Sequence, residues 1–206
     1  MRVKFKPGAK AYLDNLHFHT HVDDFQLDRL KNIKSPLVLE IGLGKGDYLL
    51  AMAKAYPDYF FMGIELNASV LSVAAQKLAN ANLENILILT GDAKYLLPKL
   101  KKESLSYIIL NHSDPWPKKR HEKRRLTHPS LIKKYYDLLE PGGELIFKTD
   151  NDDFAEYSYA TLKEAPFSSL LFNRDYKGDA PFDAKTEYEV RFLLKDVKIK
   201  MITGKK

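Results

Sequence analysis

The chain has 206 residues, of which 45% are hydrophobic, so it is long enough for one domain with its own core but short for two. It has no cysteine, which excludes disulfides, thiolate metal sites and cysteine nucleophiles, and no apolar run long enough to span a membrane. The formal net charge of +6 is concentrated at residues 118–125, where six of eight residues are Lys or Arg, and this excess favours a polyanionic partner.

Apolar runs that alternate with helical patterns predict a parallel α/β sheet. Strands are expected at 36–41, 59–64, 85–90, 105–110 and 144–148, and helices at 48–56, 68–81 and 131–139. Strands that are apolar on both faces need cover on both sides of the sheet. Two later runs, 168–172 and 188–194, have no helix between them and are expected to form an antiparallel edge pair. The predicted fold is therefore a doubly wound, mostly parallel seven-stranded sheet with helices on both faces.

Both ends of the chain are rich in lysine and arginine. We expect a single domain over residues 1–206, with a basic arm and lead-in at 1–34, a catalytic core at 35–195 and a basic tail at 196–206. The amino terminus does not resemble a signal peptide, so a cytoplasmic location is expected, with no membrane partner.

A glycine loop, Gly42-Leu-Gly-Lys-Gly46, follows the first predicted strand. Glycine allows a tight turn and a close approach of the backbone to a ligand. Open parallel sheets bind ligands beyond the carboxyl ends of their strands, and here each of the five parallel strands ends beside an acidic residue. These residues are Glu40, Glu65, Asp92, Asp114 and Asp150. Helix capping explains any one of them, but five at the same edge favour a ligand site.

The spacing of the loop favours S-adenosylmethionine over NAD. The third glycine of a dinucleotide fingerprint would fall at position 47, where Asp47 would repel a pyrophosphate. S-adenosylmethionine has no phosphate and carries a positive sulfonium, so carboxylates suit it. Glu65, 19 residues after Gly46, is expected to accept from both ribose hydroxyls, and Asp92 from the adenine amino group. Glu40 is expected near the positive charges of the cofactor.

The segment from Asn111 to Arg125 carries an acid, an aromatic residue and a basic run. Two prolines around Trp116 restrict φ, so the loop should hold Asp114 and Trp116 in fixed positions. An irregular turn with a solvated basic tail is the alternative interpretation. After a methyl-donor loop, an acid followed by a phosphate-binding run indicates a nucleic-acid active site. Trp116 would either stack on the target base or buttress the loop.

The sequence resembles the bacterial tRNA (guanine-N7)-methyltransferase family between residues 35 and 190. The motifs are Glu40-Ile-Gly-Leu-Gly-Lys-Gly46, Gly63-Ile-Glu65, Ser113-Asp-Pro-Trp-Pro-Lys-Lys-Arg-His121, Phe147-Lys-Thr-Asp150 and Thr186-Glu-Tyr-Glu189. Asp114-Pro-Trp-Pro117 and Thr186-Glu-Tyr-Glu189 are far more specific than the glycine loop. His112 departs from the family pattern, in which a Phe is expected before the Ser.

The resemblance implies a Rossmann-like class I enzyme that uses S-adenosylmethionine to methylate N7 of guanine 46 in the tRNA variable loop. It implies cofactor binding by Glu40, Gly42, Gly44, Gly46, Glu65, Asp92 and Asp114, with Asp114 as the catalytic residue. It implies substrate contacts from Lys118, Asp150, Thr186, Glu187, Tyr188 and Glu189. It implies RNA contacts from Arg120, His121, Glu122, Lys123, Arg124 and Arg125. The expected partner is tRNA, no metal is expected, and the expected state is a monomer or a homodimer.

This chemistry suits the residues. Guanine N7 has an in-plane lone pair and no proton, so no general base is obligatory, and a carboxylate such as Asp114 would stabilise the positive charge that develops on the purine. Selection of guanine needs acceptors for N1–H and the N2 amino group. Asp150 and the pair Glu187 and Glu189 are the candidates, and that pair shares one face if 186–192 is a strand. An edge strand made soluble by charge is the alternative.

The sequence fits four other functions less well. An amino-methyltransferase needs a loop that Asp114-Pro-Trp-Pro117 matches only in part, and a non-catalytic RNA-binding subunit would have no reason to keep Glu65, Asp92 and Asp114. Asp47 argues against an NAD-dependent oxidoreductase. His17-Phe-His-Thr-His-Val-Asp-Asp24 resembles a metallohydrolase motif, but no downstream histidine pattern completes a metal site.

Overall fold

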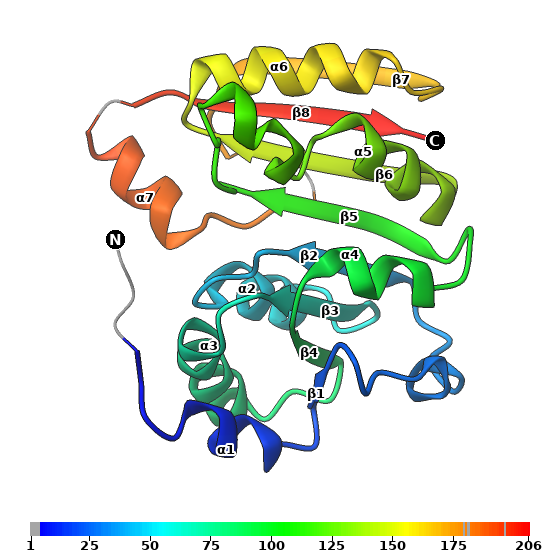
Figure 1. Cartoon of the computed structure of the whole chain (residues 1–206), viewed down its shortest axis with the longest axis vertical. Helices are drawn as coiled ribbons and strands as arrows, with labels where there is room; N and C mark the ends of the chain where they lie inside the picture. The colour runs from blue at the N-terminus through cyan, green and yellow to red at the C-terminus, as the bar shows by residue number, and fades with distance from the viewer. Residues whose placement is uncertain (1–4, 179, 181, 196) are drawn as a thin grey trace. The chain divides into compact units, whose positions relative to one another are not determined.

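The computed structural model describes residues 5–178, 180, 182–195 and 197–206 (Figure 1). The side chains of residues 187, 188 and 193 lie outside the described part, as does the start of the basic arm at residues 1–4. The chain divides into two compact units, Met1–Lys101 and Lys102–Lys206, and the two are taken in turn.

The first unit contains four parallel strands in the order β1, β4, β3, β2. They are β1 (His19–His21), β2 (Leu37–Ile41), β3 (Phe60–Glu65) and β4 (Ile86–Thr90). The last three confirm the predicted strands within a residue or two, and their buried runs of Ile, Leu and Phe are typical of parallel strands covered on both faces. The strand β1 was not predicted, since three residues are too few to show a period.

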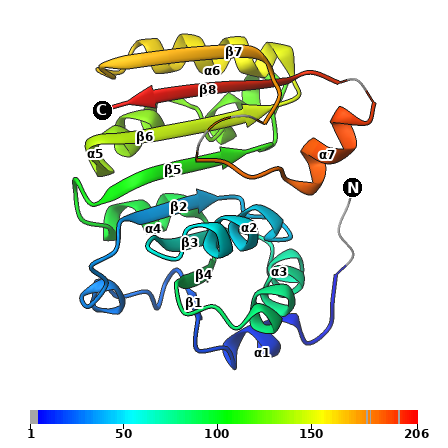
Figure 2. The same ribbon diagram turned by 180° about the vertical axis from the view of Figure 1, so that it is seen from behind.

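The helices of the first unit cover both faces of its strands. They are α1 (Ala9–Asp14), η1 (Leu27–Leu30), α2 (Asp47–Ala55), α3 (Ala68–Ala81), α4 (Ala93–Leu96) and η2 (Leu97–Lys99). Figure 2 shows α2 and α3 in front of the strands, whereas α4 lies on the other face. The helix α3 has the predicted bounds because Asn67 caps it, its side chain accepting from the N–H groups of Ser69 and Val70.

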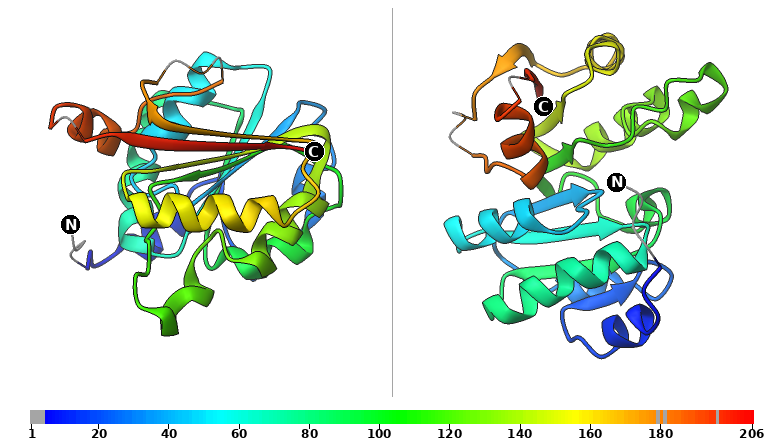
Figure 3. Two further views of the ribbon diagram at one scale, coloured as in Figure 1. Left: turned by 90° about the horizontal axis from the view of Figure 1, so that it is seen from above. Right: turned by 90° about the vertical axis from the view of Figure 1, so that its left-hand side faces the viewer.

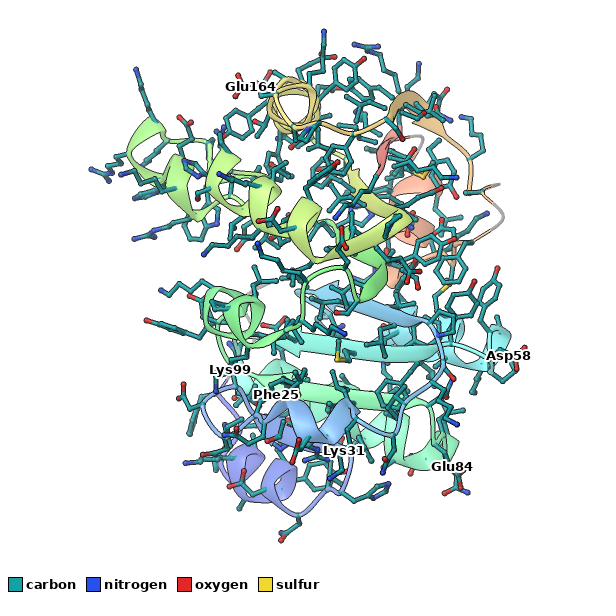
Figure 4. All side chains as sticks on the ribbon, turned by 90° about the vertical axis from the view of Figure 1, so that its right-hand side faces the viewer. Phe25, Lys31, Asp58, Glu84, Lys99 and Glu164 are labelled. Carbon is teal, nitrogen blue, oxygen red and sulfur yellow. The ribbon has the colours of Figure 1, made fainter. Side chains whose placement is uncertain are left out.

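Hydrogen bonds from the half-buried Lys99 fix the segment after β1. Lys99 Nζ donates to the backbone carbonyls of Val22, Asp23 and Phe25, at 2.7, 2.8 and 3.3 Å. Figure 4 shows Lys99 beside Phe25, whose ring is 1% exposed. One ammonium group therefore satisfies three carbonyls that no secondary structure pairs.

The second unit has four strands in the order β5, β6, β8, β7. They are β5 (Leu105–Asn111), β6 (Leu139–Thr149), β7 (Ser169–Tyr176) and β8 (Ile199–Lys205). The strands β5 and β6 are parallel, whereas β8 runs antiparallel to both β6 and β7. The helices are η3 (Lys119–Arg124), α5 (Pro129–Leu138), α6 (Asp152–Lys163) and α7 (Glu187–Leu193), and Figure 3 shows α5 and α6 on the same face of these strands.

Two expectations for the carboxyl-terminal region are corrected. Residues 188–193 are not a strand but lie in α7, with Leu194 as its C-cap, because Thr186 and Glu189 form a capping box that begins a helix. The antiparallel partner of β7 is β8, which lies in the segment expected to be a basic tail. Within the described residues the strands therefore number eight, four in each unit, and not seven. In the same part of the chain, no helix combines the length and apolarity that crossing a bilayer requires.

Candidate functional site

The glycine loop after β2 is held against β3. Its backbone N–H at Gly42 donates to the carbonyl of Ile64 at 2.8 Å. A Cβ at Gly46 would lie 2.8 Å from the Cβ of Ala74, so only glycine lets α2 pack this closely on α3. A Cβ at Gly42, where φ is +80°, would meet nothing within 4 Å. The loop is therefore packed on its inner side and has free space beside Gly42, as a ligand cradle requires.

Glu65 links this loop to the start of α3. Its Oε2 accepts from the N–H of Gly44 at 3.1 Å, and its Oε1 accepts from the N–H of Asn67 at 2.9 Å. A carboxylate offers about four acceptor positions, so each oxygen can accept one further hydrogen bond. The half-buried Glu65 can thus hold the loop and bind two hydroxyl groups together.

The other predicted donor-site acids differ in their surroundings. Glu40 on β2 is 4% exposed. Asp92 caps α4 and accepts from the backbone N–H of Lys94 at 2.9 Å, while the Nζ of the same lysine lies 3.0 Å from its second oxygen. Asp47, the residue weighed against NAD, pairs with Lys77. The acceptor-only set of Glu40, Glu65 and Asp92 fits a cationic nucleoside that carries no phosphate.

Asp114 lies in a loop with two left-handed residues. His112 has φ +46° and Trp116 has φ +42°, which are uncommon for side chains of this size. Such residues cost on the order of 1–3 kcal/mol each and persist only where their surroundings fix them. The backbone of His112 is fixed by its N–H, which donates to the carbonyl of Lys148 at 2.8 Å. The Asp114 side chain is exposed between these two constrained positions.

Trp116 is held by three side chains from the following segment. Arg125 donates to the carbonyls of Pro115 and Trp116, at 2.9 and 3.2 Å. The guanidinium of Arg124 lies 4.9 Å from the indole centroid, and the ring of His121 meets the indole edge-on at 5.6 Å. These contacts favour the buttress role for Trp116.

The basic run divides into outward and inward side chains. Lys118, Lys119, Arg120, Lys123 and Arg124 are exposed on and beside η3, and we call these five residues the basic strip. Glu122 accepts from the hydroxyl of Tyr157 at 3.3 Å, and Arg125 is half-buried against the same ring. The RNA contacts expected of Glu122 and Arg125 therefore compete with contacts that these residues make inside the second unit.

A buried charge cluster, which the sequence interpretation missed, joins β6 to the segment that leads into α7. Lys148 is 0% exposed, and its Nζ lies 2.7 Å from Asp183 Oδ1 and 2.9 Å from Glu189 Oε1. The hydroxyl of Tyr176 donates to the other oxygen of Asp183 at 2.6 Å, and burial raises the pKa of this phenol. A lysine inside the apolar run of β6 was the available signal, because buried lysines need acidic partners.

The predicted substrate residues differ in their burial and in their contacts. Thr186 begins α7, its Oγ1 accepting from the N–H of Glu189 at 3.0 Å, and Glu189 is 2% exposed. The shared face expected for Glu187 and Glu189 required a strand at 186–192, and the backbone of 187–193 is helical instead. The side chains of Glu187 and Tyr188 lie outside the described part. Asp150 follows β6, and hydrogen bonding to His112 lowers its pKa, which keeps it an ionised acceptor.

The histidine-rich segment at 17–24 makes ordinary structural contacts. His19 Nε2 lies 2.8 Å from the Thr90 hydroxyl, and His21 Nε2 lies 2.8 Å from an oxygen of Asp14. No three His, Asp or Glu side chains in the described residues are grouped to hold a metal ion.

Comparison with known proteins identifies the family. Residues 34–202 match a family model described as "Putative methyltransferase". The chain is 41% identical over 214 residues to the tRNA (guanine-N(7)-)-methyltransferase of Listeria monocytogenes serotype 4a (strain HCC23), covering 100% of this chain and 98% of that protein. It is 38% identical over 203 residues to the protein of the same name from Levilactobacillus brevis (strain ATCC 367), covering 93% of this chain and 92% of that protein.

Solved structures show the same fold at lower identity. An antibiotic-related methyltransferase gives a TM-score of 0.63 at 15% identity, covering 89% of this chain and 94% of that one. The 16S rRNA methyltransferase KamB gives 0.62 at 17% identity, covering 87% and 91%. This likeness confirms the predicted Rossmann-like methyltransferase fold. With the full-length similarity above, the chain belongs to the tRNA (guanine-N(7)-)-methyltransferase family.

Proposed function

We propose that this chain transfers the methyl group of S-adenosylmethionine to N7 of guanine 46 in the tRNA variable loop. One observation carries the proposal beyond the family itself: Asp114 lies between two left-handed residues whose backbones are held by Lys148 and Arg125, and the basic strip follows directly. We also propose that residues 1–206 act as one catalytic domain in the cytoplasm, without a metal, as a monomer or a homodimer.

The proposed donor site consists of the glycine loop and its acids. Glu65 would accept from the ribose hydroxyls while its bonds to Gly44 and Asn67 keep the loop in place. Asp92 would accept from the adenine amino group, and Glu40 would offset positive charge. The bound donor supplies an electrophilic methyl group on a positively charged sulfur.

The proposed role of Asp114 is electrostatic. When N7 of guanine takes up the methyl group, positive charge appears on the purine ring, and a carboxylate beside the base stabilises that charge. Only an interaction that is stronger in the transition state accelerates the step, so a fixed loop contributes more than a mobile one. No proton has to leave N7, and Asp114 therefore acts without serving as a base.

Substrate selection is proposed to rest on Asp150 and the basic strip. Asp150 would accept from N1–H or the N2 amino group of guanine, since its lowered pKa keeps it charged. Thr186 and Lys118 are proposed to contact the substrate near it. The exposed cations of the strip would bind tRNA phosphates and fix its position without reading sequence.

The direct test is to incubate the full-length protein with unmodified tRNA and S-adenosylmethionine labelled in the methyl group. Digestion to nucleosides should yield labelled N7-methylguanosine, lost when guanine 46 is replaced by adenine. Labelled N6- or N2-methylated nucleosides would identify an amino-methyltransferase instead. Binding of tRNA without any labelled product would identify a non-catalytic RNA-binding subunit.

A further inference from the structure

The backbone at Trp116 is in a conformation that its own sequence disfavours. Its φ of +42° lies in the left-handed region, which bulky side chains rarely adopt. The next residue is Pro117, and a proline restricts the residue before it to extended conformations. Local sequence therefore cannot maintain this turn, and contacts from elsewhere in the second unit must do so.

Arg125 makes those contacts with the backbone itself. Its Nε donates to the Pro115 carbonyl at 2.9 Å and its Nη2 donates to the Trp116 carbonyl at 3.2 Å. These two carbonyls flank Trp116, so a change in its backbone dihedrals would separate them from the guanidinium. A planar guanidinium presents N–H donors in fixed directions to these two successive carbonyls, whereas the shorter, rotatable ammonium of lysine keeps the charge without those fixed directions.

The guanidinium of Arg125 packs against two aromatic rings of α6. It lies 4.2 Å from the ring centroid of Tyr157 and 5.9 Å from that of Phe154. The Tyr157 hydroxyl donates to Glu122, and the backbone N–H of Arg125 donates to the carbonyl of Glu122 at 2.9 Å. Both the side chain and the backbone of Arg125 are thus held, which distinguishes it from the exposed cations of the basic strip.

We propose that Arg125 is a positioning residue that holds the loop 114–117 in its active conformation, and that it does not bind a tRNA phosphate. This inference rests on the function proposed above, because holding the loop affects catalysis only if Asp114 has the role proposed there. The cationic run then has two roles: the five residues of the basic strip bind the polyanion, and the sixth cation shapes the catalytic loop.

The chain offers a direct probe, because Trp116 is its single tryptophan. Intrinsic fluorescence and its quenching by acrylamide report the loop alone, in the full-length protein and without substrate. The variant Arg125→Lys keeps the charge and loses the pair of N–H donors with fixed directions. Its matched control is Arg29→Lys, because Arg29 also donates to two carbonyls, those of His17 and His19, at 2.6 and 3.3 Å. Lys123→Ala serves as the reference for a lost phosphate contact.

For Arg125→Lys we expect stronger acrylamide quenching of Trp116 and a kcat at least tenfold lower, with KM for tRNA within twofold of the unmodified protein. Arg125→Ala, which removes the charge, should keep the salt dependence of tRNA binding shown by the unmodified protein. Guanidinium ion at millimolar concentration should partly restore the kcat of Arg125→Ala, which a merely structural role would not explain. Arg29→Lys should change none of these quantities.

Loss of a phosphate contact would bring the slope of log K against log salt about 0.7 to 0.9 closer to zero, as expected for Lys123→Ala. That result in Arg125→Ala, with unchanged Trp116 fluorescence, would overturn the proposal. If Arg125→Lys does not fold, Tyr157→Leu removes the ring against which the guanidinium packs and should also raise the acrylamide quenching of Trp116. Unchanged quenching in this variant would likewise overturn the proposal. Absence of methylated product from the unmodified protein would refute the proposed function, while the fluorescence still decides whether Arg125 holds the loop.

Discussion

Lys148 and Glu189 form an ion pair in the interior of the second unit, with 2.9 Å between Nζ and Oε1 and no more than 2% exposure of either side chain. Asp183 completes the cluster at 2.7 Å from the same ammonium. Removing one charge from such a cluster leaves the others buried without compensation. We therefore expect Lys148→Met to lower the free energy of unfolding by about 3–5 kcal/mol, measured by urea denaturation.

A surface pair provides the control for this cluster. Lys177 lies 2.7 Å from Asp175, but both side chains are largely exposed. Lys177→Met should cost less than about 1 kcal/mol. Equal losses in the two variants would contradict the buried character of the Lys148 cluster.

Glu65 connects the glycine loop to the start of α3, and its negative charge is proposed to bind the ribose. Glu65→Gln should weaken binding of S-adenosylmethionine by roughly tenfold to a hundredfold, since charged hydrogen bonds contribute about 1.5–3 kcal/mol. Isothermal titration calorimetry measures this loss. The exposed Glu84→Gln is the matched control and should bind as the unmodified protein does; unchanged binding in Glu65→Gln would remove this residue from the donor site.

Asp114 is proposed to act on the transferring methyl group and not on tRNA affinity. Asp114→Asn should lower kcat by about 10²–10³, in line with the loss of one preorganised electrostatic contact. The dissociation constant for tRNA, measured by filter binding, should change less than threefold. A parallel loss of tRNA affinity would argue that Asp114 binds the substrate and does not promote the reaction.

The basic strip should determine how tRNA binding responds to salt. With five exposed cations on phosphates, the plot of log K against log salt should have a slope of about −3.5 to −4.5. Replacing Lys119, Arg120 and Lys123 together by Ala should bring this slope about 2 to 3 closer to zero. A slope unaffected by the triple substitution would mean that the strip is only solvated.

His19 should make stability depend on pH. Burial, followed by the neighbouring charge of His21, lowers its pKa from 6.5 to about 4. The unfolded chain then binds more protons between these values, so the contribution of His19 is complete above pH 6.5 and is lost as the pH falls toward 4. Between pH 4 and 6.5, the free energy of unfolding should change by at least about 1 kcal/mol less in His19→Gln than in the unmodified protein, as measured by thermal unfolding. The exposed His17→Gln should retain the full dependence.

Much of the architecture could be predicted from local sequence. The strands at 36–41, 59–64 and 85–90 were found because long apolar runs between helices fit only a covered parallel sheet. The helix at 68–81 was found to the residue, because its cap and its apolar period agree. The prediction of a strand at 188–194 was wrong. Aromatic and β-branched residues suggested a strand there, but the capping box of Thr186 and Glu189 begins a helix.

The sequence by itself determined the chemistry that is available: a glycine loop with acceptor-only acids, a proline-bounded acidic loop and a cationic run, all in the order of one enzyme family. Only the tertiary structure decided how the like-charged residues divide their roles. Arg125 turns inward to backbone carbonyls while Lys123 faces solvent, and Glu189 pairs with buried Lys148 while Asp114 stays exposed. The reason is physical: the charge of a side chain is fixed by its type, but its partners and its solvation are set by residues that are distant in sequence.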